Sequence, residues 1–178
     1  ASVINVSLGG TGACSKFAQS AINQIRSAGA LIVASAGNGG GDVFQPANCE
    51  GVMAVAALDK DGSRANYSAI GKPISIAAPG GYYHGILGVS NRGAQGPEDS
   101  ILSNRTGTSF ASPLVASAAA LIKSVNSSLS GQDIKNILES TAQNFMSITG
   151  KQCMESQGMG VCDCKRGLCG ARICGEGG

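Results

Sequence analysis

Charged residues are scarce in this chain of 178 residues, where Asp, Glu, Lys and Arg together make up only 13%. The formal net charge is +2, from 13 basic and 11 acidic residues. A balance so close to neutral gives no reason, on charge alone, to expect a nucleic-acid partner. Because 43% of the residues are hydrophobic, the chain is also not a disordered acidic or basic tail, and its length suits one globular domain.

Long hydrophobic runs and a leader sequence are missing as well. The longest apolar runs are residues 28–36, interrupted by Gly29 and Ser35, and residues 114–122, interrupted by Ser117, and each is about half as long as a membrane span. Residues 1–15 have neither a basic start nor a signal-peptide cleavage pattern. We therefore expect no membrane-spanning helix, no membrane partner and no signal peptide.

Aromatic residues make up only 4% of the chain, and there is no tryptophan, whereas glycine occurs 27 times. Such a composition favours tight turns and close packing of helices on a sheet. The seven cysteines suit an oxidising compartment better than the cytosol. Since seven is an odd number, at least one thiol is expected to be free, intermolecular or a metal ligand.

Four short apolar segments predict the strands of a parallel sheet that is buried on both faces. They are residues 3–8, 31–34, 52–56 and 74–77. Residues 79 to about 100 read as a long loop. After Gly150 the periodicity stops, so we expect a domain over residues 1–150 and a Gly/Cys-rich tail over 151–178.

Three segments have helical periodicity. The first begins after Ser15, a good N-cap residue, and ends at Gly29. The longest covers residues 108–125, with Pro113 expected in about the first turn, where a missing N–H costs little. The last follows Ser130, which starts a pattern typical of a capping box. Strands alternating with helices predict an α/β fold with a mostly parallel sheet.

The start of the longest helix carries the first candidate site residue. In the segment GTSFASP (107–113), Ser109 lies in the first turn, near the positive end of the helix dipole and free backbone N–H groups. A nucleophile that generates an oxyanion needs this environment. The alternative is that Thr108 or Ser109 is only an N-cap.

Asn38 is the second candidate. It follows the buried strand 31–34 at its carboxyl end, which is where ligands bind in open parallel sheets. Its side-chain amide has N–H groups to donate to an anion. The alternative is a turn asparagine ahead of the flexible run 39–41.

Several segments together resemble the subtilisin-like serine proteases, or subtilases, and in particular secreted bacterial members. The similarity extends over about residues 1–145, with the motifs in the family's order and spacing. The matching segments are VINVSLGG (3–10), AGN (36–38), QPA (45–47), AAPG (77–80) and GTSFASP (107–113). The resemblance implies the C-terminal part of a three-layer α/β catalytic domain, with helices on both faces of the sheet.

The resemblance also assigns roles to individual residues. Ser109 falls on the catalytic serine and Asn38 on the side chain that donates to the oxyanion. Ser7, Leu8 and Gly9 fall on the segment that pairs with the substrate backbone. Ala36 and Gly37 fall on the wall of the first side-chain pocket. These assignments predict a secreted endopeptidase that hydrolyses peptides or proteins through an acyl-enzyme on Ser109.

The family's catalytic Asp and His have no counterpart in this sequence. Their motifs precede the strand that starts here at Val3, and the only histidine, His84, lies in a Gly- and Tyr-rich loop. Because a serine without a base is a poor nucleophile, we expect another segment or chain of the same protease to supply both residues. The alternative is a non-catalytic subtilase-like module that binds peptides or has a structural role. A nicotinamide-dependent oxidoreductase would require nucleotide binding, and residues 10–15 lack the third glycine and the later acidic residue of that fingerprint.

Further expectations concern the cysteines and two acidic residues. Cys14 and Cys49 each follow a strand at the same end of the sheet, so a disulfide between them is expected. For the five tail cysteines, from Cys153 to Cys174, disulfides are favoured over zinc because no C-x2-C pair occurs, with unpaired thiols as the alternative. An acidic floor of the first pocket, from Asp42 or Glu50, would select Arg or Lys, whereas the favoured alternative is that both are solvated loop carboxylates.

No cofactor is needed for the expected chemistry and no catalytic metal site is expected. Structural calcium is common in the resembled family. The best-known calcium loops of that family precede this chain, however. Asp59 and Asp61 are therefore interpreted as solvated carboxylates on a surface turn.

Overall fold

The computed structural model describes residues 1–143. The expected tail over residues 151–178, with its five cysteines, lies outside the described residues. The elements run in the order β1 Val3–Val6, α1 Lys16–Ser27, β2 Leu31–Ser35, β3 Met53–Leu58, β4 Ile74–Pro79, β5 Ile86–Asn91, β6 Ser100–Arg105, α2 Thr108–Val125 and α3 Gly131–Thr141.

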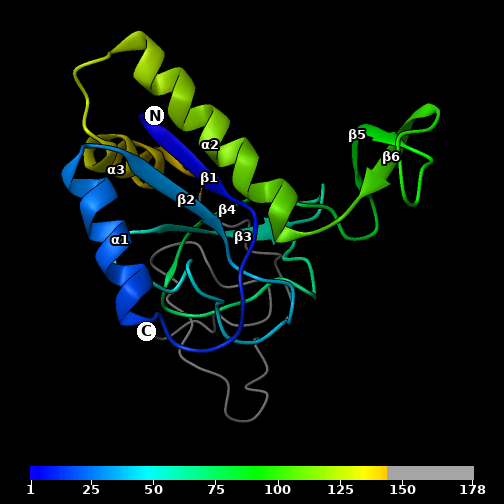
Figure 1. Ribbon diagram of the computed structural model, residues 1–178, viewed down its shortest axis with the longest axis horizontal. Coiled ribbons are helices and arrows are strands. Elements are labelled where there is room, and N and C mark those ends of the chain that lie inside the picture. The colour runs from blue at the N-terminus through cyan, green and yellow to red at the C-terminus, as the bar shows by residue number, and fades with distance from the viewer. Residues whose placement is uncertain (144–178) are drawn as a thin grey trace.

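The central sheet has the strand order β1-β2-β3-β4, and all four strands are parallel (Figure 1). The middle strands β2 and β3 are buried along almost their whole length, as expected for continuous apolar runs. β1 is an edge strand of the described sheet, and it pairs with β2 from Val3 opposite Leu31 to Val6 opposite Ala34.

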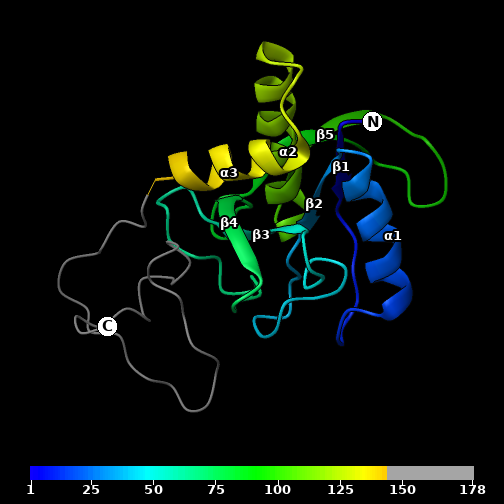
Figure 2. The same cartoon turned by 90° about the vertical axis from the view of Figure 1, so that its left-hand side faces the viewer.

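Helices cover both faces of this sheet (Figures 1 and 2). On one face, Ile22 of α1 packs against Ile32, Ala34 and the apolar loop that follows β2. On the other face, α2 and α3 pack against Val33 and Met53. The predicted α/β class, with three layers and a parallel sheet, is therefore confirmed.

The helix α2 lies close to the sheet because its inward positions are small. Ala111 and Ala119 are completely buried, and α2 contacts each of the strands β1 to β4. By length and composition α2 is long and apolar enough to cross a membrane, and 33% of its residues are buried within the described structure. A core helix of a globular domain can have the same length and composition. The packing of α2 on the sheet accounts for its buried apolar residues.

Two predictions about local structure are wrong. The segment expected to be a loop from residue 79 to about 100 contains β5, which pairs antiparallel with β6 in a separate two-stranded sheet that projects away from the main sheet (Figure 1). The sequence of β5 does not show the usual alternation of apolar inward and polar outward residues. Its exposed side carries the apolar residues Leu87 and Val89, at 62% and 87% exposure, and its half-buried side carries Gly88 between them. Pro113 is the sixth residue of α2 rather than a residue of its first turn.

The other local signals are found as predicted. The Ser15 hydroxyl accepts a hydrogen bond from the N–H of Ala18, and Ser130 forms a capping box with Asp133. Cys14 and Cys49 form a disulfide, with a Cα–Cα distance of 5.0 Å. This bond closes a loop of 35 residues, which in the chain-entropy model stabilises the fold by about 4 kcal/mol.

Candidate active site

Ser109 is the second residue of α2, next to the end of the edge strand. The N-cap position belongs to Gly107, which makes no side-chain cap, so neither Thr108 nor Ser109 is the N-cap. The Ser109 hydroxyl donates a hydrogen bond of 3.3 Å to the carbonyl oxygen of Ser7. Within residues 1–143, the backbone N–H of Ser109 has no acceptor, which leaves it available to a ligand at the helix start.

Asn38 lies three residues beyond the end of β2 and faces the same helix start. Its side-chain oxygen accepts two hydrogen bonds from Thr108, one from the backbone N–H at 2.9 Å and one from the hydroxyl at 2.8 Å. With the oxygen held in this way, the amide nitrogen is the free end of the side chain, and it lies beside Gly107. This is more than a local turn, because the contact joins residues 70 positions apart.

Thr108 is a site residue that the sequence interpretation did not single out. Its side chain is buried, and its hydroxyl accepts a hydrogen bond of 3.2 Å from the N–H of Gly37 while it donates to Asn38. One side chain therefore fixes both the backbone of the 36–38 segment and the orientation of the Asn38 carboxamide.

The residues predicted to bind substrate belong to two backbone segments that contact the start of α2. Ser7 contacts Ser109, and the next residues, Leu8 and Gly9, are exposed beyond the end of β1. Ala36 and Gly37 are buried on the other side. The structure thus brings the 7–9 segment to Ser109 and the 36–38 segment to Thr108.

Residues 44 and 45 connect the 7–9 segment with the 36–38 segment through backbone hydrogen bonds. The N–H of Phe44 donates to the Ala36 carbonyl, and Gln45 exchanges two backbone hydrogen bonds with Gly10. The aromatic ring of Phe44 lies where a Cβ at Gly37 would meet it at 2.6 Å. Phe44 is thus a second residue that the sequence interpretation missed, since the absence of a side chain at Gly37 is what makes room for its ring.

Within the described part of the chain, no carboxylate lies next to Gly9, Gly37 or Gly39. Glu50 is exposed near α1, where its N–H and carbonyl oxygen bind the side chain of Gln19 at 2.9 and 3.0 Å. Asp42 is also exposed. The side chain that lies against Gly37 is the aromatic ring of Phe44, so the geometry gives no support to the hypothesis of an acidic pocket.

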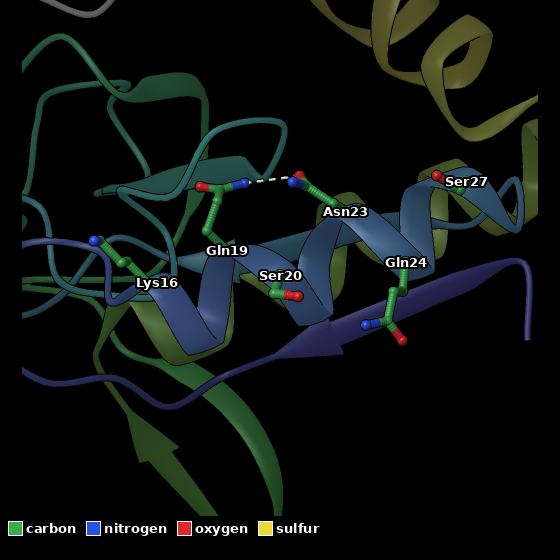
Figure 3. Close-up of a pocket in the computed structure, with 6 residues that line it drawn as sticks. All are labelled: Lys16, Gln19, Ser20, Asn23, Gln24 and Ser27. Carbon is green, nitrogen blue, oxygen red and sulfur yellow. Dashed lines mark hydrogen bonds between the residues drawn. The ribbon is translucent and has the colours of Figure 1, made fainter.

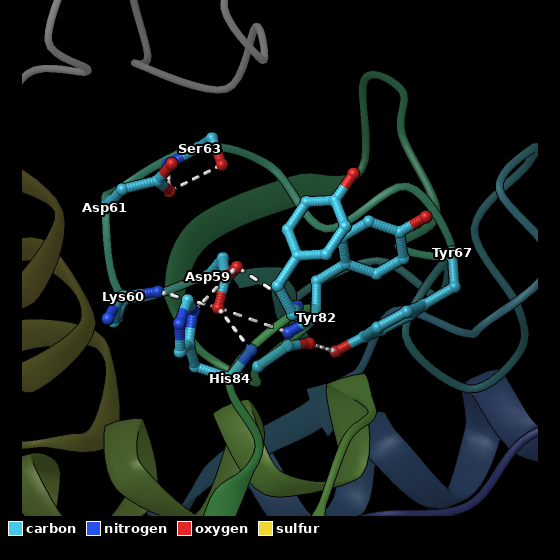
Figure 4. Close-up of polar contacts among 9 residues, drawn as sticks. Asp59, Lys60, Asp61, Ser63, Tyr67, Tyr82 and His84 are labelled. Atoms are coloured by element: carbon cyan, nitrogen blue, oxygen red, sulfur yellow. Dashed lines mark hydrogen bonds and ion pairs between the residues drawn. The ribbon is translucent and has the colours of Figure 1, made fainter.

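Asp59 is buried, which corrects its interpretation as a solvated surface carboxylate (Figure 4). It accepts hydrogen bonds from the N–H groups of Lys60, Tyr82, Tyr83 and His84, at 2.9 to 3.4 Å. These bonds fold the 80–84 segment around the carboxylate. The segment in turn supports the start of α2, because the N–H of Gly107 donates to the carbonyl of Gly80.

His84 takes part in this anchor and not in a contact with Ser109. Its Nδ1 lies 3.6 Å from Oδ2 of Asp59, and its side chain is about half exposed. Although an Asp–His pair resembles part of a catalytic triad, both Asp59 oxygens are used by backbone N–H groups of the loop. The prediction of a loop position for His84 is therefore correct.

The hydrogen bonds at Asp59 predict a pH-dependent contribution to stability. Burial of the carboxylate would raise its pKa, but the N–H groups of Lys60, Tyr83, Tyr82 and His84 together hold the pKa of Asp59 below its ordinary value. A lowered pKa stabilises the fold above the unfolded-state pKa of about 3.9, and this stabilisation is lost as the pH falls through the lower folded-state pKa. We expect Asp59→Asn to lower the free energy of unfolding by about 2–4 kcal/mol at pH 7, measured by urea unfolding.

The matched control for this prediction is Asp61→Asn. Asp61 lies two residues away, is exposed and bonds only to Ser63, so a small change is expected. The difference between wild type and Asp59→Asn is also expected to shrink below pH 4. A difference that stayed constant down to pH 2 would show that the Asp59 charge is not what stabilises the loop.

One recess away from Ser109 lies along one face of α1, has a volume of about 610 Å³ and is lined by polar side chains of that helix alone (Figure 3). Among them, the Gln19 amide donates to the Asn23 side chain at 3.0 Å. Within residues 1–143, no three His, Cys, Asp or Glu side chains gather as metal ligands would.

Comparison with known proteins gives a single family. The family model described as "Subtilase family" matches residues 1–160. An extracellular protease of Xanthomonas campestris is 42% identical over 146 residues, covering 80% of this chain and 25% of that protein. Subtilisin DY of Bacillus licheniformis is 37% identical over 148 residues, covering 80% of this chain and 50% of that protein.

Solved structures agree with the sequence matches. A protease from Pseudoalteromonas arctica superimposes with a TM-score of 0.80 at 39% identity, covering 94% of this chain and 50% of that chain. The present chain thus spans half or less of the length of these relatives.

Proposed function

The chain belongs to the subtilase family, and from that membership we propose that it is the part of a secreted serine endopeptidase that carries the nucleophile, Ser109. The observation that carries this proposal is the pair of hydrogen bonds from Thr108 to Asn38. These bonds hold the Asn38 side chain against Thr108, the residue before Ser109. They therefore support a role for Asn38 as a fixed donor near the Ser109 backbone N–H.

In the proposed mechanism, the Ser109 hydroxyl attacks the carbonyl carbon of the scissile peptide bond. Its proton passes to a histidine supplied by a preceding segment, and the same imidazole then protonates the leaving amine. The negative charge on the carbonyl oxygen is stabilised by the Asn38 amide and the Ser109 N–H, both of which are oriented before the reaction. Water then hydrolyses the ester on Ser109.

The substrate is proposed to bind as an extended strand along Ser7, Leu8 and Gly9. Within the described residues, the backbone groups of Leu8 and Gly9 make no backbone hydrogen bond, so they are available to a further strand. Such pairing recognises the peptide backbone and leaves side-chain selection to the pockets. Peptides and proteins are therefore the proposed substrates.

The missing Asp and His are proposed to come from a preceding segment of the same protease that packs on β1 and α2. Two features support this partner. One edge of β1 pairs with no strand among the described residues, and such an edge is a template for a further strand. The outward side of α2 exposes large apolar residues, namely Leu114 at 44%, Leu121 at 68% and Val125 at 89%, as an unfilled packing surface does.

Secretion is proposed from the Cys14–Cys49 disulfide and from the name of the Xanthomonas relative, an extracellular protease. The proposed chemistry uses only protein groups.

Labelling with a fluorophosphonate tests this function against a peptide-binding module without turnover. The protein produced from its complete gene is treated with the probe, digested and mapped by mass spectrometry. The proposal predicts an adduct on Ser109 in native protein and none in Ser109→Ala. A folded native protein that cleaves no peptide and takes no label would instead support the binding module.

Phe44 predicts how the first side-chain pocket responds to substitution. Because its ring lies against Gly37, on the proposed wall of the pocket, Phe44→Ala is expected to enlarge the pocket. The ratio of kcat/KM for a tetrapeptide p-nitroanilide ending in Phe to that for one ending in Ala is expected to rise by about tenfold or more over wild type. Phe17→Ala is the matched control, since Phe17 lies on α1 and is 86% exposed. An unchanged ratio in Phe44→Ala would place the pocket elsewhere.

A further inference from the structure

A chain of hydrogen bonds connects β1 to the first turns of α2 behind Ser109. The hydroxyl of Ser112 donates to the side-chain oxygen of Asn5 at 2.6 Å, and the side-chain amide of Asn5 donates to the Ser7 hydroxyl at 2.9 Å. The Ser7 hydroxyl donates in turn to the carbonyl oxygen of Ser109, also at 2.9 Å. Every donor in this series is used once, and all bonds run in the same direction.

This series of hydrogen bonds ends at the Ser109 carbonyl because α2 contains a proline, Pro113. In an α-helix the carbonyl of residue 109 accepts from the N–H of residue 113, but Pro113 has no N–H. The Ser109 carbonyl therefore lacks its helical partner, and the Ser7 hydroxyl takes that place. The proline is tolerated within the second turn of α2 because a side chain from another element satisfies this carbonyl.

The spacing of the four residues fits the two elements that carry them. Asn5 and Ser7 are two residues apart on an extended segment, so they point to the same side. Ser109 and Ser112 are three residues apart on a helix and therefore lie on one face. Ser112 is completely buried, and its hydroxyl needs an internal partner, which Asn5 provides.

We propose that Asn5, Ser112 and the Ser7 hydroxyl form a clamp that positions the Ser109 backbone against the substrate-binding strand. This inference rests on the proposed function. The clamp fixes the distance between the attacking hydroxyl, which α2 carries, and the scissile carbonyl, which a peptide paired with residues 7–9 presents. None of the three side chains is a catalytic residue, since each acts through the position of Ser109.

The clamp predicts a loss in kcat rather than in KM. In the protein from its complete gene, Asn5→Ala is expected to lower kcat by about 10- to 100-fold with KM changed by less than about twofold, because small displacements of a reacting group have effects of this size. Ser7→Thr keeps a hydroxyl and is expected to retain most of the activity that Ser7→Ala loses. Asn136→Ala is the matched control, since Asn136 is an exposed asparagine on α3 that bonds only to Gln132.

A double-mutant cycle tests the role of the proline. Pro113→Ala supplies an N–H for the Ser109 carbonyl, so the further effect of Ser7→Ala is expected to be at least about threefold smaller in that background. Equal effects in both backgrounds would overturn the clamp. So would an Asn5→Ala variant whose kcat equals that of Asn136→Ala. An inactive wild-type protein would contradict the proposed function itself, which separates the two failures.

Discussion

Replacing Ser109 with alanine is expected to lower kcat by about 10⁶-fold in the protein produced from its complete gene, since removal of the nucleophile alone has an effect of this size in a subtilisin. The Ser109 side chain makes a single hydrogen bond among the described residues, to the Ser7 carbonyl. Its loss should therefore leave the fold intact. The measurement is the initial rate of hydrolysis of a chromogenic peptide, with thermal unfolding as the test of folding.

Ser117→Ala is the matched control for this substitution, because Ser117 is an exposed serine of the same helix. Its activity should equal that of wild type. If Ser109→Ala were folded and kept more than about 1% of the wild-type kcat, another residue would have to be the nucleophile.

The second large effect concerns the oxyanion. Asn38→Ala is expected to lower kcat by about 10²- to 10³-fold with little change in KM, which is the effect measured for loss of such a donor in a subtilisin. The change removes the amide nitrogen, which makes no hydrogen bond within the described residues while Thr108 binds the side-chain oxygen. Steady-state kinetics on one peptide substrate, with KM and kcat determined separately, measures this effect.

Asn38→Asp refines this test, because aspartate keeps the oxygen that Thr108 binds but has no N–H to donate. It is expected to be at least as inactive as Asn38→Ala. An Asn38→Asp variant with wild-type kcat would show that Asn38 only holds the loop in place.

Much of the fold follows from local sequence signals. The strands at 31–35 and 53–58 are continuous apolar runs, and such runs are sufficient to predict a buried parallel sheet. The helix boundaries follow from Ser15, Gly29 and Ser130, whose capping preferences act within a few residues. The hairpin β5–β6 was missed because its stability comes from cross-strand pairs and its exposed face is apolar.

The candidate site was predicted only in part, for a related physical reason. Ser109 and Asn38 belong to segments whose local patterns are distinctive. The residues that orient them act across the chain: Thr108 reaches Asn38 over 70 positions, and Ser112 reaches Asn5 over 107. Phe44 was equally hidden, since the room for its ring depends on Gly37, which belongs to another segment. Such pairings are set by the topology of the sheet and leave no trace in a local pattern.

The burial of Asp59 could not be predicted from its local sequence either. Its neighbours Lys60 and Asp61 are polar and exposed, so the local sequence indicates a solvated turn. Three of the four N–H groups that enclose the carboxylate come from residues 82–84, more than twenty positions later.

The most direct measurement is a crystal structure of the complete protein with a peptide boronic acid, whose tetrahedral adduct imitates the reaction intermediate. The two proposed catalytic groups, from α2 and from the loop after β2, must meet on one boron centre. The account predicts a covalent bond from boron to Oγ of Ser109 and a boronate oxygen about 2.7–3.1 Å from Nδ2 of Asn38. An adduct on another residue, or one whose oxygens lie beyond hydrogen-bond reach of Asn38, would contradict it.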